Sequence, residues 1–244
     1  MKAMILAAGL GTRLRPWTLT HPKALVPVEG VPMLERVICR LRDNGTDYIV
    51  VNVHHFAEQI IDFLADHDFG VEIAISDERE ALLDTGGALL HAAPLLLRDS
   101  RPVLVHNVDI LSDAPLQQLM AEHEAGGGDA TLLTSHRDSS RRLVFDAAGR
   151  LRGWHNLSAD QWKPEGFRAA ATDSQEAFSG IHIIKPGLIA SMEADGFSGS
   201  FSVIDYYLAL AKRGHDIRHN CRPELRLLDI GKPATLAQAE ALGI

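Results

Sequence analysis

The sequence predicts an α/β fold: a Rossmann-like three-layer αβα sandwich around a mixed, mainly parallel sheet. The first observation is that short apolar or β-branched runs alternate with stretches of helical periodicity through the first half of the chain, which is typical of parallel strands joined by helices. The second is size and composition. With 244 residues, 46% apolar and 23% charged, the chain can bury one core of this kind.

In the first half, strands are expected at residues 3–7, 48–53, 71–75, 103–105 and 131–134, and helices at 33–43, 56–64, 87–96 and 116–124. The helix at 33–43 is typical, because its apolar residues recur three and four positions apart. Open α/β sheets bind ligands at the carboxyl ends of their strands. Residues 8–13, 77–85 and 106–109 fall there, so a ligand site is expected among them.

The second half is less regular. A hairpin is expected from strands at 142–145 and 151–154 around the turn Asp146-Ala147-Ala148-Gly149. Residues 156–176 are polar and predict a long surface loop. Further elements are expected as strands at 178–184 and 225–229 and helices at 203–212 and 233–242, the last with a proline near its first turn. No linker or repeat divides the chain, so residues 1–244 are expected to form a single domain.

Composition narrows the class of partner. The formal net charge of −8 argues against nucleic acid, which requires a basic face. No apolar stretch approaches the ~20 residues needed to span a bilayer, and the apolar start is too short for a signal peptide. Cys39 and Cys221 have no metal-type spacing, so zinc is not expected. We therefore expect a cytoplasmic protein without a membrane partner, either a monomer or a homodimer.

The segment after the first strand favours phosphate binding. Small residues there let backbone N–H groups approach a polyphosphate closely; they are Ala7, Ala8, Gly9 and Gly11. Arg13, and beyond it Arg15, adds a guanidinium that can bind phosphate oxygens in bidentate fashion. Lys23 supplies a further positive charge.

Two common phosphate-binding motifs are excluded. The segment lacks the G-x-x-x-x-G-K-[ST] pattern of a Walker A loop. It also departs from the dinucleotide fingerprint, because Leu14 stands in the place of the third glycine and Pro16 interrupts the helix that should follow. A bare G-x-G is equally typical of a tight turn, so the interpretation depends on the whole run together with Arg13 and Lys23.

Two carboxylates are predicted at strand ends. Asp109 follows the strand at 103–105, and Asp229 ends the strand at 225–229. A carboxylate in such a place either caps a turn or binds a metal, and two of them can share one Mg²⁺ ion. The run Asp84-Thr85-Gly86-Gly87 precedes a helix, where it could either lie against a flat base or simply cap the helix with Thr85.

These segments together resemble the sugar-1-phosphate nucleotidylyltransferases. Residues 6–16, LAAGLGTRLRP, and 22–28, PKALVPV, are similar to the family signature L-A-A-G-x-G-[ST]-R-[LM]-x-P followed by P-K-x-[LM]-x-P. The resemblance extends through 84–89, 107–109, 178–184 and 229–231. It is greatest to the small single-domain group that resembles N-acetylmuramate-1-phosphate uridylyltransferase. The family has a GT-A-like nucleotide-diphospho-sugar transferase fold.

The resemblance implies an enzyme that transfers a nucleotidyl group from a nucleoside triphosphate to a sugar-1-phosphate, expected to be UTP and an N-acetylated hexosamine-type sugar. It implies a nucleotide-binding half at 1–135 and a sugar-phosphate half at 136–244. Arg13 and Lys23 would be catalytic, and Asp109 and Asp229 would hold Mg²⁺, which Mn²⁺ could replace. Nucleotide contacts are expected from Ala7, Ala8, Gly9, Gly11, Thr12, Asp84, Thr85, Gly86, Gly87 and Asn107, and sugar contacts from Ser179 and Gly180.

The chain departs from the family pattern in two places that affect the site. Val108 stands where the family has a glycine, but the aspartate that follows, Asp109, is present. Many members carry a Glu-Lys-Pro run whose lysine contacts phosphate, but Trp154-His155-Asn156 stands there in this sequence. Lys163, in the expected loop, is an open candidate for a replacement.

Other activities remain open at this point. Guanylyl transfer to mannose- or heptose-1-phosphate, or cytidylyl transfer to phosphocholine, would use the same phosphate-binding motifs. A non-catalytic nucleotide-sugar-binding subunit is an alternative of another class, and the presence of Arg13, Lys23, Asp109 and Asp229 argues against it. An NAD-dependent oxidoreductase is disfavoured by the missing third glycine.

Overall fold

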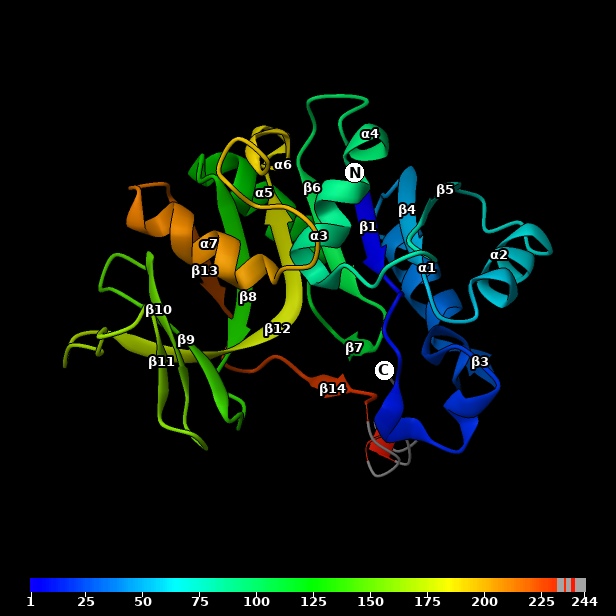
Figure 1. Cartoon of the computed structure of the whole chain (residues 1–244), viewed down its shortest axis with the longest axis horizontal. Helices are drawn as coiled ribbons and strands as arrows, with labels where there is room; N and C mark the ends of the chain where they lie inside the picture. Colours follow the sequence, from blue (N-terminus) through cyan, green and yellow to red (C-terminus); the bar gives the residue numbers. More distant parts are fainter. Residues whose placement is uncertain (232–234, 236–237, 240–244) are drawn as a thin grey trace.

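The computed structural model describes residues 1–231, 235, 238 and 239. One ten-stranded sheet runs through the molecule in the order β11-β10-β9-β12-β6-β1-β4-β5, and β8 and β13 join it beside β12 (Figure 1). Four neighbouring strands of the first half, β6, β1, β4 and β5, are parallel. Antiparallel β12 joins this parallel part to the strands of the second half.

The strands of this sheet are β1 (Lys2–Leu6), β4 (Tyr48–Val53), β5 (Glu72–Asp77), β6 (Val103–Asn107), β8 (Ala130–Ser135), β9 (Arg141–Phe145), β10 (Leu151–Asn156), β11 (Gln161–Lys163), β12 (Ser174–Ile184) and β13 (Ile217–Cys221). Two small sheets pair β2 (Pro27–Val28) with β3 (Val31–Pro32) and β7 (Ile110–Ser112) with β14 (Leu227–Asp229). The helices are α1 (Met33–Asp43), α2 (Ala57–Ala65), α3 (Asp84–His91), α4 (Ala93–Leu96), α5 (Leu116–Gly126), α6 (Pro186–Ser191) and α7 (Val203–Lys212). Three 3₁₀ turns precede β2, namely η1 (Thr12–Leu14), η2 (Trp17–Leu19) and η3 (Lys23–Leu25).

Helices cover both faces of the sheet, which confirms the three-layer sandwich. Successive side chains of a strand point to opposite faces, and β1 divides its residues accordingly: Ala3 and Ile5 pack into one buried cluster, Met4 into another. The first cluster contains side chains of α1, α2 and α5. The second contains side chains of α3, α4, α6 and α7. The core thus holds the strand ends of the parallel part in fixed positions.

Most predicted elements lie within two or three residues of the observed ones, with two corrections. The helix expected at 87–96 is two helices: α3 begins earlier, at Asp84, and α4 begins at Ala93. Pro94 explains the break, because it cannot donate a hydrogen bond back into α3. The loop expected at 156–176 contains β11 and the start of β12, because β11 pairs with the edge of β10 and β12 pairs with β9.

The helix expected at 233–242 falls largely outside the described residues. β14 is the last strand described, and it lies antiparallel to β7, with Asp229 opposite Ile110 (Figure 1). This pairing brings Asp229 close to Asp109, which follows the carboxyl end of β6. Across the described part of the chain, no helix is both long and apolar enough to span a bilayer.

Candidate active site

The glycine-rich segment 7–16 directly follows the carboxyl end of β1. Gly11 has a φ of 60°, a left-handed conformation that favours glycine. A Cβ at this position would lie 2.8 Å from Cβ of Lys23 and 2.9 Å from Cγ2 of Thr18. Thr18 also donates its hydroxyl to the Gly11 carbonyl, at 2.9 Å. Gly11 therefore lets the loop pack directly against Lys23, which explains why these two parts of the sequence signature occur together.

One backbone group of this segment already has a partner. The Ala7 amide donates to Oδ1 of Asn52, at 2.6 Å, and the residue is buried. The expectation that its N–H contacts phosphate is corrected, since that hydrogen is occupied inside the fold. Ala8 and Gly9 line the cavity described below. They are the parts of the loop placed to meet a ligand.

Asp109 and Asp229, which the sequence suggested could share one ion, lie close together. The Ile230 amide donates to the Asp109 carbonyl, at 2.8 Å, and Lys23 forms an ion pair with Oδ2 of Asp109. Burial, and next the charge of Asp109, raise the pKa of Asp229 above its ordinary value, while Lys23, Arg13 and Arg137 act in the opposite direction.

The donors around Asp229 fit a divalent cation. Its Oδ1 is buried and has no hydrogen-bond partner among the described residues. Buried carboxylate oxygens are normally satisfied, and a hard cation prefers oxygen ligands of this type. A bound cation would also remove the repulsion between Asp109 and Asp229, so the residues present fit such an ion.

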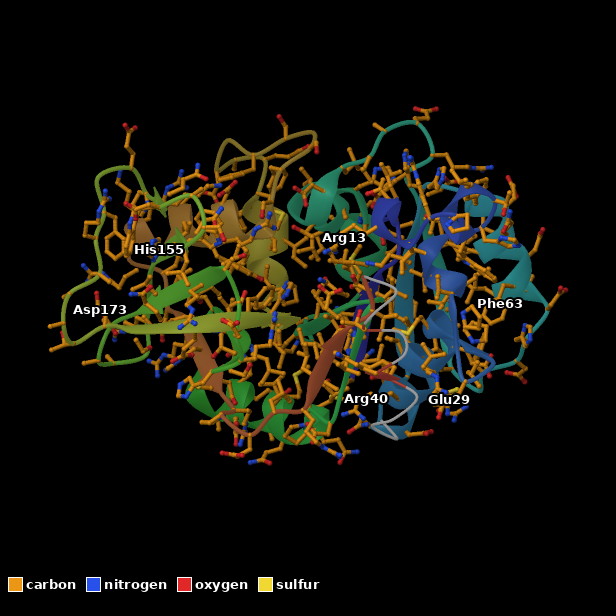
Figure 2. The ribbon with its side chains drawn as sticks, turned by 90° about the horizontal axis from the view of Figure 1, so that it is seen from below. Arg13, Glu29, Arg40, Phe63, His155 and Asp173 are labelled. Carbon is orange, nitrogen blue, oxygen red and sulfur yellow. The ribbon has the colours of Figure 1, made fainter. Side chains whose placement is uncertain are left out.

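Arg13 lies beside this carboxylate pair. A Cβ at Gly231 would be 2.6 Å from a terminal nitrogen of Arg13 and 2.7 Å from Oδ1 of Asp229. The glycine of the D-x-G run therefore leaves space for the guanidinium. Figure 2 shows Arg13 near the middle of the molecule, between the half that carries Phe63 and the half that carries His155.

Two cavities open next to the carboxylates. The smaller, about 410 Å³, is lined by Leu6, Ala8, Gly9, Lys23, Asn52, Glu78, Leu82, Asp84, Thr85, Asn107, Val108, Asp109 and Ser200. The larger, about 880 Å³, has walls that include Arg13, Arg137, Arg141, Arg142, Trp154, Lys163, Phe178, Asp205 and Asp229. Asp84 lines both. Two ligands could therefore meet at the carboxylate pair, one from each cavity. The ligand in the larger cavity would be surrounded by cationic side chains.

The glycines of the Asp84-Thr85-Gly86-Gly87 run serve packing within the fold. A Cβ at Gly86 would lie 2.3 Å from the Phe201 ring, and one at Gly87 would lie 2.2 Å from the Gly199 carbonyl oxygen. Both glycine amides donate to the Phe201 carbonyl. Neither glycine is among the residues that line the smaller cavity, and their expected contact with a base stays a prediction.

Asp84 and Thr85 keep their place in the cavity wall. Asp84 has a φ of 57° and begins α3, so the alternative in which Thr85 caps the helix is wrong. Instead, the Thr85 hydroxyl accepts a hydrogen bond from the Val203 amide, at 3.0 Å. The run therefore joins the two halves of the chain as well as lining the smaller cavity.

Of the two residues predicted to contact the sugar, Ser179 lies inside the fold and Gly180 lies next to a residue of the smaller cavity wall. Ser179 is fully buried, and its hydroxyl donates to the Leu133 carbonyl, at 2.7 Å. Its predicted contact with a sugar is corrected, because the hydroxyl cannot reach a ligand. Gly180 has a φ of 77°, and a Cβ there would lie 2.9 Å from Nδ2 of Asn107. Gly180 therefore allows Asn107 to take its position in the wall of the smaller cavity.

Three arginines of the larger cavity, Arg137, Arg141 and Arg142, were not predicted, whereas Lys163 was an open candidate from the sequence. Arg137 donates to the Phe178 carbonyl, at 2.9 Å, and its Nε is buried without a partner among the described residues. Burial lowers the pKa of Arg137, while Asp229 acts in the opposite direction. Lys163 pairs with Asp205, at 2.6 Å. The basic run from 137 to 142 could have indicated this cationic wall.

A further group of possible ligands lies on β12, on β13 and directly after β8. His136, Glu176 and Cys221 place their ligand atoms within 4.8 Å of one another. Burial, and next the charge of Glu176, raise the pKa of the Cys221 thiol to about 11. A thiol in this state holds its proton and is a poor ligand. Glu176 is already held by Thr134, Ser174 and His219, so the group is accounted for as part of the fold.

Comparison with known proteins identifies the family. A family model described as nucleotidyl transferase matches residues 2–239. The N-acetylmuramate alpha-1-phosphate uridylyltransferase of Caulobacter vibrioides is 33% identical over 98% of this chain and 95% of its own length. The enzyme of the same name from Neisseria meningitidis serogroup B is 34% identical over 99% and 98%.

A solved structure agrees with the fold. The structure of a putative glucose-1-phosphate thymidylyltransferase from Bacillus anthracis superposes with a TM-score of 0.80 at 20% identity, covering 99% of this chain and 94% of that one. The nucleotide-diphospho-sugar transferase fold expected from the sequence is thus confirmed. The chain belongs to the nucleotidyl transferase family, and the resemblance of its motifs to the sugar-1-phosphate nucleotidylyltransferases is confirmed.

Proposed function

We propose that this enzyme transfers a uridylyl group from UTP to the 1-phosphate of an N-acetylated hexosamine-type sugar, such as N-acetylmuramate 1-phosphate, and releases pyrophosphate. The observation that carries the proposal is the similarity, over nearly the whole chain, to two N-acetylmuramate alpha-1-phosphate uridylyltransferases. The two cavities that adjoin at Asp84 supply space for a nucleotide and an acceptor.

The nucleotide is assigned to the smaller cavity and the sugar phosphate to the larger one. The smaller cavity has the phosphate-binding loop, Thr85 and Asn107 in its walls, and residues 1–135 supply nearly all of it. The larger cavity has walls built mainly from residues 136–244, and its arginines and Lys163 suit an anionic acceptor. A muramate-type acceptor carries a carboxylate besides its phosphate, which a wall with several cations can bind.

The reaction needs positioning and charge neutralisation more than acid–base chemistry. An oxygen of the acceptor phosphate is already anionic at neutral pH and attacks the α-phosphorus of UTP. A new P–O bond forms, the bond from the α-phosphorus to the α,β-bridging oxygen breaks, and pyrophosphate leaves in line with its electron pair. Bringing two anions together is the main barrier, and preorganised positive charge lowers it.

Arg13 and Lys23 supply that charge from the chain itself. Arg13 lies beside Asp229 in the wall of the larger cavity, from which it can neutralise the β- and γ-phosphates where the two cavities adjoin. Lys23, paired with Asp109, lies in the wall of the smaller cavity, close to the phosphates of the nucleotide. The backbone from Ala8 to Thr12 holds the triphosphate. A Mg²⁺ ion, for which Mn²⁺ can substitute, would be held by Asp109 and Asp229 and would add positive charge next to the α-phosphate.

The proposal is tested by assaying the purified protein with each of four nucleoside triphosphates against a panel of sugar-1-phosphates, with pyrophosphate release as the readout. We expect turnover with UTP and an N-acetylated sugar, and its loss in EDTA. Preference for GTP with mannose- or heptose-1-phosphate would instead establish the guanylyl alternative. Nucleotide-sugar binding without turnover on any pair would identify a non-catalytic subunit.

A further inference from the structure

Part of the wall of the larger cavity is apolar, although most of its side chains are polar or charged. The apolar side chains come from β9, β10, β12 and α7, which lies beside β10 (Figure 1). They are Leu143, Trp154, Phe178 and Ile204. Leu143 and Trp154 stand directly opposite each other in the antiparallel pair β9–β10, so their side chains lie on one face of the sheet. Apolar surface in a ligand cavity favours an apolar part of the ligand, which phosphate and hydroxyl groups do not supply.

Trp154 is the largest of these side chains, and its orientation is set within the fold. It is half-buried, so part of the indole faces the cavity. Lys163 stands opposite it on β11, with Nζ of the lysine 5.4 Å from the centroid of the Trp154 ring. Asp205 on α7 holds the Lys163 ammonium at 2.6 Å. A cation over an aromatic face attracts the ring, so the indole is positioned before a ligand arrives.

The indole N–H of Trp154 is available to a ligand. It has no hydrogen-bond partner among the described residues, and it is not buried. Trp162 on β11 differs, because its N–H donates to Asp160, at 3.0 Å. Trp154 therefore presents an apolar ring with one hydrogen-bond donor at its edge. An N-acyl group has the complementary parts, a methyl group next to a carbonyl oxygen.

We propose that Trp154 binds the N-acyl group of the acceptor sugar, packing its ring against the methyl group and donating its N–H to the acyl carbonyl. The inference rests on the proposed function, since it assigns the acceptor to the larger cavity. Trp154 stands where many members of the family carry the glutamate of a Glu-Lys-Pro run. A carboxylate accepts hydrogen bonds from hydroxyl groups, whereas an indole only donates one. The tryptophan therefore favours an acylated amine over a hydroxyl at the sugar carbon that faces it.

The test uses UTP with two acceptors: the N-acetylated sugar-1-phosphate that wild type uses best, and its N-formyl analogue, which lacks only the methyl group. Wild type should have a kcat/KM ~10-fold or more higher for the N-acetyl acceptor, as expected for one methyl group in an apolar pocket. Trp154→Ala should bring this ratio close to one, because the apolar contact is lost. Trp154→Phe keeps an aromatic ring but loses the N–H. It should keep the ratio while kcat/KM falls ~3–10-fold for both acceptors.

The change should appear in KM for the acceptor while KM for UTP stays constant, which a general loss of structure would not produce. Trp162→Phe and Trp162→Ala are the matched controls, since Trp162 is a tryptophan of the adjacent strand that lines neither cavity. Both controls should keep the wild-type ratio and KM values. If Trp154→Ala does not fold, Trp154→Gln takes its place, because glutamine keeps more volume but not the apolar ring.

Three results would overturn the inference. They are equal use of the two acceptors by wild type, a folded Trp154→Ala or Trp154→Gln protein that keeps the wild-type ratio, and a Trp154→Phe protein with unchanged kcat/KM. Failure of the proposed function is distinguishable, because wild type would then use no N-acetylated acceptor with UTP, whereas failure of this inference leaves that turnover intact.

Discussion

Asp109 and Asp229, which stand in opposite halves of the chain, are joined through the antiparallel pair β7–β14, in which the Ile230 amide donates to the Asp109 carbonyl at 2.8 Å. Asp229 keeps a buried oxygen without a partner among the described residues. Like charges brought together in a buried place destabilise the fold unless a cation is bound. Lys23, Arg13 and Arg137 offset part of this repulsion, but the pKa of Asp229 is still raised.

Asp229→Asn should lower catalytic activity while raising the stability of the fold. We expect ~100-fold or greater loss of kcat, because one ligand of the proposed cation and its charge are removed. The folded-state pKa of Asp229 is raised, so its contribution to stability is present at low pH and is lost as pH rises through the folded-state pKa. At neutral pH the variant should therefore unfold at a higher urea concentration than wild type in metal-free buffer. Asp113→Asn, which alters an exposed carboxylate paired with Arg226, is the control. Full activity of Asp229→Asn would remove Asp229 from the site.

Lys23→Ala should reduce turnover far more than stability. The ammonium lies between Asp109 and the smaller cavity, where positive charge favours the transition state more than the ground state. We expect a ~100–1,000-fold lower kcat, measured by pyrophosphate release, with a thermal midpoint close to wild type. Lys185→Ala removes an exposed lysine paired with Asp129 and should leave kcat unchanged. An unfolded Lys23→Ala protein would show that the lysine is structural.

Lys163→Ala tests whether this residue replaces the lysine that the family pattern places elsewhere. Lys163 lies in the wall of the larger cavity, near the face of Trp154 and paired with Asp205. Loss of a charged contact should raise KM for the sugar-1-phosphate ~10-fold while KM for UTP stays constant. Lys212→Ala, at the exposed end of α7, is the matched control. An equal rise in both KM values would argue against a specific acceptor contact.

Gly180→Ala should affect both the fold and the site. The left-handed backbone costs about 1–2 kcal/mol for any residue other than glycine, and the new Cβ would also meet Asn107 and Ile110 at 2.9 and 3.1 Å. Gly214→Ala is the matched control, since Gly214 has a φ of 90° and no atom within 4 Å of the new Cβ. Urea unfolding should show a larger loss for Gly180→Ala, and only this variant should raise KM for UTP. Equal losses in both variants would exclude the contact with Asn107.

Glu176 should govern stability in acid. Burial alone would raise its pKa, but hydrogen bonds from His219, Thr134 and Ser174 outweigh burial and lower the pKa to about 2. A depressed pKa gives stability that is present above the unfolded-state pKa and is lost as pH falls towards 2, amounting to about 3 kcal/mol. Urea unfolding between pH 5 and pH 3 should show most of this loss in wild type and in Glu193→Gln, an exposed control. Glu176→Gln should be less stable at pH 7 and should lose less stability than wild type over the same pH range; a slope equal to that of wild type would contradict the assignment.

Local periodicity of apolar residues was sufficient to predict the strands and helices that bury one face. The helices at 33–43 and 203–212 and the strand at 48–53 begin and end where the sequence predicted. The spacing of apolar side chains along one helix or strand is a local property of the sequence. The core requires this spacing, because each such element must present an apolar face to it. The short strands β7, β11 and β13 were not predicted, because each depends on pairing with a distant strand more than on its own pattern.

The sequence by itself determined the family motifs: the glycine-rich loop, Arg13, Lys23, Asp109 and Asp229. Only the tertiary structure decided what these residues contact. It placed Asp109 and Asp229 at one site, occupied the Ala7 amide with Asn52, and buried the Ser179 hydroxyl. The reason is that hydrogen-bond partners and burial depend on neighbours in space, which strand order and packing bring together from distant parts of the chain.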